Sequence, residues 1–175
     1  MISFIVPCFN EENRIVQTIS EIDKACSKVK IDDHKIYIVD DCSVDNSEQV
    51  IKNEIKLKSH IIYHRNIKNM GFGGAAKIGL YAHNDSYLMW LPGDNAHPAS
   101  ELVKILEKFT SRKVEYDIIS TFYGKNSHRN FFRKFFTNSY TPLLNFIFGL
   151  KIPYYNGLSI IKKSVLDQIK IKTNA

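Results

Sequence analysis

The stretch KIYIVDDCSVDNSEQVI, residues 35–51, decides the fold class of this chain. Residues 35–40 form a short apolar run of the kind found in buried strands. Asp45 is placed to cap a helix, and Glu48, three residues further on, completes the pattern of a capping box. The stretch therefore predicts a buried strand, a polar turn and a helix in direct succession.

The same succession is repeated on both sides of this stretch. Short apolar runs alternate with segments of helical periodicity five times in about 120 residues. This alternation is typical of an α/β domain with a mostly parallel sheet and helices on both faces. The predicted strands cover residues 2–6, 35–40, 60–64, 87–91 and 117–122, and the predicted helices cover residues 11–28, the segment after residue 45, residues 73–82 and residues 100–109.

The pattern changes after residue 122. Residues 125–133 are polar and basic, and residues 135–150 are rich in Phe, Leu and Ile, with Pro142 expected to bend them. We predict one more strand over residues 154–161 and a short helix over residues 164–169. No repeat, low-complexity stretch or linker interrupts the chain, so we expect a single domain.

Composition and charge fit one globular domain with anionic partners. The chain has 175 residues, 44% hydrophobic and 24% charged, which excludes disordered, collagen-like and disulfide-scaffold classes. Its net charge of +6 fits phosphates, nucleic acid or an acidic membrane face. A solvated basic surface explains that charge equally well.

The cysteines and the N-terminus indicate a cellular compartment. Three cysteines are too few for a disulfide framework, so we expect reduced thiols in a cytosolic setting. No segment has the roughly 20 consecutive apolar residues of a transmembrane helix. The N-terminus lacks the basic start of a signal peptide. We therefore expect a cytoplasmic protein.

Polar loops follow four successive predicted strands. Ligands of open α/β sheets bind beyond the carboxyl ends of the strands, so these loops are the candidate site. Any one of them could be polar only because loops usually are, but that explanation is weak for all four together. The loops comprise residues 7–12, 40–43, 66–74 and 92–95.

Three of these loops contain candidate ligand-binding groups. Asp40 and Asp41 are adjacent like charges: Asp40 could cap the turn, which leaves Asp41 to accept hydrogen bonds from a base or sugar. Gly71, Gly73 and Ala76 match G-x-G-x-x-A, but after the third strand, where they favour close packing or a diphosphate at a helix N-terminus. Asp94 is either a ligand for a divalent cation or a turn residue.

A basic cluster adjoins the apolar residues 131–150. Cations beside bulky apolar side chains suit a phosphate that carries a lipid chain, or a helix at a membrane interface. A core helix with a solvated basic end is the alternative. The cluster consists of Lys125, His128, Arg129, Arg133 and Lys134.

Four motifs in order resemble those of the family 2 glycosyltransferases. IVPCFNEE resembles V-P-x-Y-N-E-E, and VDDCSVDNS resembles V-D-D-G-S-T-D-G-T. NMGFGGAAKIGL resembles N-x-G-x-G-x-A-x-x-x-G, and LPGDNAHP resembles L-D-A-D-x-Q-H-P. Within the family, the chain looks closest to the branch that resembles dolichyl-phosphate mannosyltransferase, whose acceptor is a polyprenyl phosphate.

The resemblance implies a GT-A fold and a glycosyltransferase that transfers a sugar, with inversion, from a nucleotide-diphospho-sugar. Residues 1–124 would bind that donor, and residues 125–175 would form the acceptor side of the same domain. The nucleotide-binding residues would be Pro7, Phe9 (in place of the usual Tyr), Glu11, Asp40, Asp41, Asn69, Gly71, Gly73 and Lys77.

The resemblance also implies catalytic residues. Asp94 falls at the second aspartate of D-x-D, while Pro92 replaces the first. We therefore expect Mg²⁺ or Mn²⁺ to bind weakly at Asp94, and only together with a nucleotide. Arg129 and Arg133 would grip the acceptor phosphate. The expected partners are the donor, a lipid-phosphate acceptor and a membrane surface at its cytoplasmic face, and not nucleic acid.

Two other interpretations remain open on the sequence. The chain ends where family members usually continue, which fits a truncated or degenerate relative that binds a nucleotide-sugar or a partner without turnover. The G-x-G-x-x-A match fits a nucleotide-dependent oxidoreductase, but its place after the third strand counts against that class.

Overall fold

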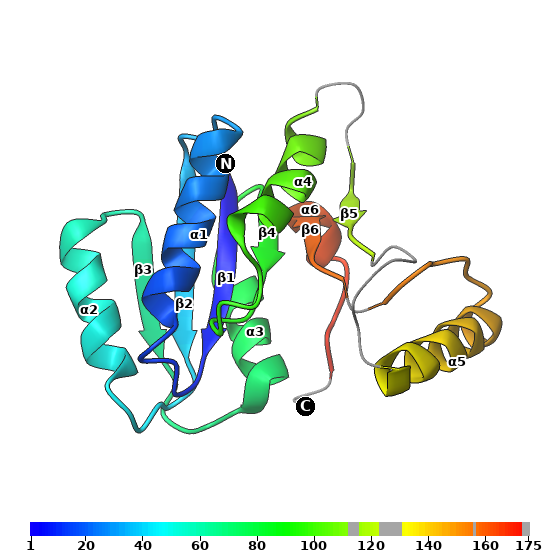
Figure 1. Cartoon of the computed structure of the whole chain (residues 1–175), viewed down its shortest axis with the longest axis horizontal. Coiled ribbons are helices and arrows are strands. Elements are labelled where there is room, and N and C mark those ends of the chain that lie inside the picture. The colour runs from blue at the N-terminus through cyan, green and yellow to red at the C-terminus, as the bar shows by residue number, and fades with distance from the viewer. Residues whose placement is uncertain (112–115, 123–130, 156, 173–175) are drawn as a thin grey trace. The chain divides into compact units, whose positions relative to one another are not determined.

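The structure is a computed structural model of the chain, and it describes residues 1–111, 116–122, 131–155 and 157–172, with the backbone alone for 131–139. Strands and helices alternate as the sequence predicts (Figure 1). The elements are β1 (Ile2–Cys8), α1 (Ile15–Lys28), β2 (His34–Asp40), α2 (Ser47–Leu57), β3 (Ile61–Arg65), α3 (Gly71–Tyr81), β4 (Tyr87–Trp90), α4 (Ala99–Thr110), β5 (Ile118–Ser120), α5 (Phe131–Phe148), β6 (Ser159–Lys162) and α6 (Lys163–Leu166).

The strands form one mostly parallel sheet in the order β3-β2-β1-β4-β6-β5. β1 pairs in parallel with β2 on one side and with β4 on the other, and β2 pairs in parallel with β3. β6 is antiparallel to β4. All seven residues of β1 are buried, as its central place requires. The carboxyl ends of β1, β2, β3 and β4 therefore lie along one edge of the sheet.

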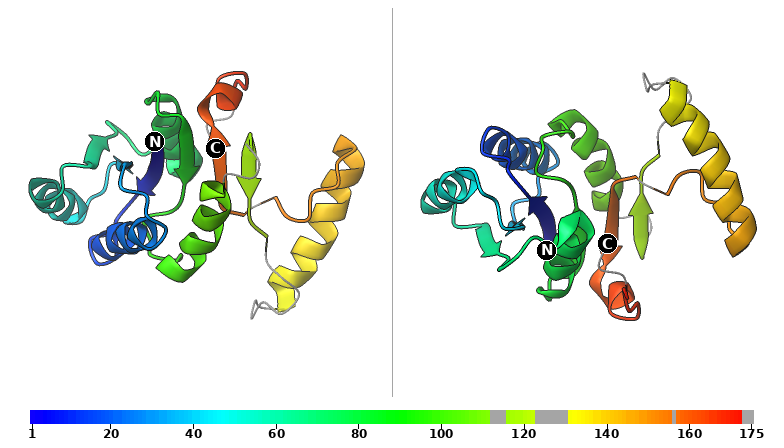
Figure 2. Two further views of the ribbon diagram at one scale, coloured as in Figure 1. Left: turned by 90° about the horizontal axis from the view of Figure 1, so that it is seen from above. Right: turned by 90° about the horizontal axis from the view of Figure 1, so that it is seen from below.

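Helices cover both faces of this sheet. α1 and α4 contact each other on one side of the strands, and α3 lies on the other side against β1, β2 and β4 (Figure 2). α1 buries Ile15, Ile19 and Ile22 completely. α3 lies very close to the sheet, because a Cβ added at Gly79 would come within 2.3 Å of Ile5 Cγ2. The predicted α/β fold class is confirmed.

The chain divides into two compact units. The first consists of residues 1–119 together with 160–175, and it contains β1 to β4 with their helices. The second consists of residues 120–159 and contains α5, which is one helix that includes Pro142. Residues 160–172, which include α6, thus belong to the first unit, and the acceptor side expected over residues 125–175 stays a prediction. None of the helices in the described residues is both long and apolar enough to span a membrane.

Candidate active site

A pocket of about 400 Å³ opens where β1, β2 and β4 end. Its walls come from the loops after these strands and from the beginning of α3. The predicted site residues are partly brought together here. The lining residues are Pro7, Cys8, Phe9, Glu11, Asp41, Asn69, Gly71, Phe72, Ala75, Pro92, Gly93 and Asp94.

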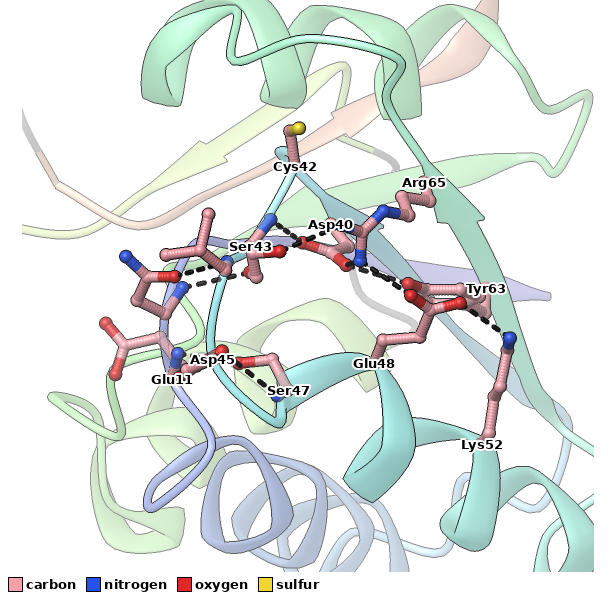
Figure 3. Close-up of polar contacts among 12 residues, drawn as sticks. Glu11, Asp40, Cys42, Ser43, Asp45, Ser47, Glu48, Lys52, Tyr63 and Arg65 are labelled. Atoms are coloured by element: carbon pink, nitrogen blue, oxygen red, sulfur yellow. Dashed lines mark hydrogen bonds and ion pairs between the residues drawn. The ribbon is translucent and has the colours of Figure 1, made fainter.

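Hydrogen bonds join the loop after β1 to the loop after β2. The backbone N–H of Asn10 donates to Ser43 Oγ at 2.9 Å, and the N–H of Val44 donates back to Asn10 Oδ1 at 2.9 Å. The N–H of Glu11 donates to Ser47 Oγ at 2.8 Å (Figure 3). Asn10 has a φ of 57°, in the left-handed region that Asn tolerates better than most residues. These bonds fix two walls of the pocket relative to each other.

Asp40 lies behind the pocket wall and not in its lining. Its carboxylate is fully buried and accepts hydrogen bonds from the N–H of Ser43 at 2.8 Å and from Tyr63 Oη at 2.7 Å. Arg65 donates to the same carboxylate at 3.0 Å and to Glu48 at 2.7 Å (Figure 3). The contacts give Asp40 the structural role that the sequence left open for it, holding the turn that follows β2.

The predicted capping box of α2 is wrong. The helix has no side-chain cap at Asn46, and Glu48 turns away to contact Arg65 and Lys52. Asp45 instead accepts hydrogen bonds from the N–H of Ser47 at 3.0 Å and from that of Glu12 at 3.1 Å. The ion pair with Arg65 competes for Glu48, and local sequence does not reveal a partner that lies 17 residues away.

Asp41 does line the pocket, and it is only 3% exposed. Its Oδ1 accepts hydrogen bonds from Asn66 Nδ2 at 2.7 Å and from the N–H of Met70 at 2.8 Å. Among the residues that the structure describes, none donates a hydrogen bond to its Oδ2. Asp41 therefore orients the loop before α3 and keeps one charged acceptor for a ligand.

Carboxylates dominate the charge of the pocket. Glu11, Asp41 and Asp94 line it, and its described lining contains no Lys, Arg or His. Burial raises the pKa of Glu11, and nearby Asp94 adds to the increase, while Arg14 opposes it. A diphosphate would be repelled here unless a cation accompanied it. Phe9, 45% exposed, provides an aromatic surface in the same pocket.

The glycines of two loops have different roles. Gly71 has a φ of 73° and nothing within 4 Å of its absent Cβ, so the chain can turn into α3 at the pocket. A Cβ at Gly93 would lie 3.1 Å from the backbone oxygen of Pro7, so Gly93 lets the loop carrying Asp94 approach β1. Gly73 and Lys77 belong to α3 but not to the pocket lining.

Five lining residues were not among the predicted site residues: Cys8, Phe72, Ala75, Pro92 and Gly93. Cys8 lies inside the first motif, in the loop after the first predicted strand. Burial, followed by Asp40, raises the pKa of its thiol to about 12, so it packs as an uncharged side chain. Phe72 is 48% exposed and makes an edge contact with Trp90 at 5.5 Å between ring centroids.

The proposed catalytic residues are only partly described. Asp94 lines the pocket, and its Oδ1 accepts a hydrogen bond from the N–H of Ala96 at 3.0 Å. Arg129 lies outside the described residues, and only the backbone of Arg133, within α5, is described. Within the described chain, the three side chains close enough to share a metal ion are not in this pocket but at Asp23, His34 and His60.

Comparisons with known proteins agree with this geometry. The chain is 26% identical to an uncharacterized protein of Methanocaldococcus jannaschii, over 95% of the chain and 73% of that protein. It is 24% identical to an undecaprenyl-phosphate 4-deoxy-4-formamido-L-arabinose transferase of Proteus mirabilis, over 76% of the chain and 40% of that transferase. It thus spans less than half of that enzyme.

Among solved structures, the fold is similar to that of a mannosyltransferase from Pyrobaculum calidifontis in complex with GDP-Man and Mn²⁺. The TM-score is 0.64 at 12% identity, over 95% of this chain and 46% of the other. This similarity shows a GT-A fold. The model of the family described as "Glycosyl transferase family 2" matches residues 3–170, nearly the whole sequence. The chain therefore belongs to glycosyl transferase family 2.

Proposed function

We propose that this chain is the donor-binding part of an inverting glycosyltransferase that moves a sugar from a nucleotide-diphospho-sugar to a polyprenyl phosphate. The observation that carries the proposal is the pocket at the ends of β1, β2 and β4. It combines an aromatic surface at Phe9 with the carboxylates of Glu11, Asp41 and Asp94. The relative from Proteus mirabilis, named for an undecaprenyl-phosphate substrate, supports the class of acceptor.

The donor would lie with its base on Phe9 and its sugar-phosphate side toward α3. Phe9 can stack on a base, and Asp41 Oδ2 can accept a hydrogen bond from the base or the ribose. The backbone N–H groups at the beginning of α3, after the turn at Gly71, favour a phosphate. Pro7 and Asn69 complete this wall.

The oxygen atoms that line the pocket fit a hard divalent cation such as Mg²⁺ or Mn²⁺. Oxygen ligands are what these ions prefer, and one or two carboxylates plus substrate phosphates suffice for them. Asp94 would hold the ion. Glu11 lies close enough that the charge of Asp94 raises the pKa of Glu11. The ion would neutralise negative charge on the departing diphosphate. We expect weak binding in the absence of a nucleotide.

Transfer would need positioning more than proton removal. The acceptor phosphate is already ionised, so its oxygen can attack the anomeric carbon without a general base. The new carbon–oxygen bond forms as the bond to the donor diphosphate breaks, and the electron pair leaves with the nucleoside diphosphate. Attack opposite the leaving group inverts the configuration. Arg129 and Arg133 are proposed to hold the acceptor phosphate.

The test is transfer of labelled sugar to a polyprenyl phosphate by the purified chain. UDP- and GDP-sugars are offered with Mn²⁺ or Mg²⁺. We expect Asp94→Asn to lower transfer roughly 100-fold, because charge neutralisation matters most in the transition state. Its effect on donor affinity should be much smaller.

Asp33→Asn, an exposed carboxylate near the beginning of β2, is the matched control and should leave transfer unchanged. Full activity in excess chelator would contradict the metal assignment. Donor binding without transfer to any polyprenyl phosphate would instead favour a binding protein without turnover. A thermal shift with NAD, and none with UDP or GDP compounds, would favour the oxidoreductase.

A further inference from the structure

A cluster of histidines and an aspartate lies at the edge of the sheet opposite the pocket. His34 is the first residue of β2, His60 directly precedes β3, and Asp23 comes from α1. Both imidazoles contact the same carboxylate oxygen: His34 Nε2 lies 3.1 Å and His60 Nε2 lies 2.9 Å from Asp23 Oδ1. The two rings are 4.8 Å apart between centroids. Neither the pocket nor its chemistry uses this cluster.

The spacing of these atoms is close to that of a zinc site. One ligand atom from each residue lies within 4.8 Å of the others. Ligands about 2.0–2.1 Å from a tetrahedral zinc ion are about 3.3 Å apart, so small side-chain rotations suffice. The side chains of His34, Asp23 and His60 are 12%, 26% and 30% exposed, so a water molecule can occupy the fourth position.

The surroundings orient the carboxylate of this cluster. Lys58 Nζ contacts Asp23 Oδ2 at 3.0 Å, which turns Oδ1 toward the histidines. His34 Nδ1 is buried and has no hydrogen-bond partner among the described residues.

We propose that Asp23, His34 and His60 bind a divalent transition-metal cation of the zinc class. Two imidazole nitrogens and one carboxylate oxygen suit zinc better than Mg²⁺ or Mn²⁺, which prefer oxygen ligands alone. The bound ion links α1 to the starts of two neighbouring strands, so it stabilises the fold. This site is separate from the nucleotide-dependent ion expected at Asp94.

The structure also indicates the strength of binding. When zinc occupies Nε2 of His34, the ring proton moves to Nδ1, which has no acceptor in the part of the chain that the structure describes. Missing partners of this kind cost about 10–100-fold in metal affinity. We therefore expect a Kd of roughly 10⁻⁶ M, which is weaker than that of closed structural zinc sites.

The test is a titration of the full chain with Zn²⁺ by calorimetry, and with Co²⁺ by absorption, without nucleotide. We expect one equivalent to bind, a tetrahedral Co²⁺ band, and a melting temperature that rises by several degrees at saturation. His60→Gln should weaken binding at least 100-fold. His64→Gln, an exposed histidine on β3, should leave binding within about twofold and is the matched control.

Two further variants separate this site from other ligands. Asp94→Asn and Cys42→Ser should both bind zinc as the unaltered chain does. No binding by the unaltered chain at 100 µM zinc, a figure set at about 100 times the expected Kd, would overturn the proposal. Equal binding by His60→Gln, or loss of binding in Cys42→Ser, would also overturn it, since the ion would then lie elsewhere.

Discussion

At the scale of single residues, Asp41 carries the first prediction. Asp41→Asn keeps an oxygen for Asn66 and the N–H of Met70, but it replaces the second oxygen with an amide N–H₂. A charge-assisted hydrogen bond contributes about 1.5–3 kcal/mol, so nucleotide affinity should fall about tenfold or more. Calorimetry with UDP and GDP compounds measures this, and Asp33→Asn serves as the control. Unchanged affinity would contradict the proposed binding of the nucleoside at Asp41.

Cys42 is strained by its backbone conformation. Its φ of 66° lies in the left-handed region, where a Cβ costs about 1–2 kcal/mol. Glycine removes that cost but adds about 0.4–1 kcal/mol of chain entropy in the unfolded state. Cys42→Gly should therefore raise the free energy of unfolding by about 0.5–1 kcal/mol, as measured by urea denaturation. Cys42→Ala keeps the Cβ and should give no such gain; an equal gain in both variants would contradict the explanation.

At the scale of elements, Asp45 links the loop after β1 to the beginning of α2. Burial opposes its charge, but hydrogen bonds from Ser47 and from the N–H of Glu12 outweigh burial and lower its pKa below the usual Asp value. A lowered pKa in the folded state stabilises the protein above the ordinary Asp pKa of 3.8, and this stability is lost as pH falls below it.

Asp45→Asn should therefore cost about 1 kcal/mol at pH 7, and the difference from the unaltered chain should shrink near pH 3. Urea denaturation at the two pH values measures both. Glu107→Gln, an exposed carboxylate on α4, is the control. A difference that stays the same at pH 3 would show that the charge of Asp45 does not contribute to the link.

The order of elements was predictable from the sequence, because each depends on a local pattern. β1 and β2 are apolar runs, and α1 and α4 have helical periodicity. Details that depend on distant partners were not predictable. Glu48 fits a capping box in the local sequence, but in the structure it forms an ion pair with Arg65 at the end of β3. The strand predicted over residues 154–161 is shorter and later, at Ser159–Lys162, where pairing with β4 defines it.

At the scale of the whole molecule, the sequence predicted where the pocket lies, beyond the carboxyl ends of the strands, but not every side chain that lines it. The rule that ligands bind at carboxyl ends pointed to Glu11, Asp41 and Asp94, which do share a pocket. Asp40 has the same local pattern as Asp41, and only the tertiary contact with Tyr63 and Arg65 distinguishes them. The histidine cluster at the other edge combines residues up to 37 positions apart, which no spacing in the sequence indicates.

The last prediction concerns α5 and a membrane surface. Leu143, Phe146 and Ile147 recur at helical spacing and are 55%, 87% and 59% exposed. An exposed apolar stripe in a chain of net charge +6 fits a peripheral contact with an anionic membrane. We expect the chain to sediment with vesicles rich in an anionic lipid, and raised salt to weaken the binding.

Variants on this stripe test whether it makes the contact. Leu143→Ser combined with Phe146→Ser removes apolar side chains that are each worth about 1.5–3 kcal/mol when buried, so vesicle binding should fall more than tenfold. Leu57→Ser, at an apolar residue 79% exposed at the end of α2, is the matched control and should bind as the unaltered chain does. If the double variant binds vesicles as well as the Leu57→Ser control does, the stripe does not contribute and basic side chains alone hold the protein at the membrane surface. If the unaltered chain stays in the supernatant at low salt, the stripe does not bind an anionic membrane and the prediction fails.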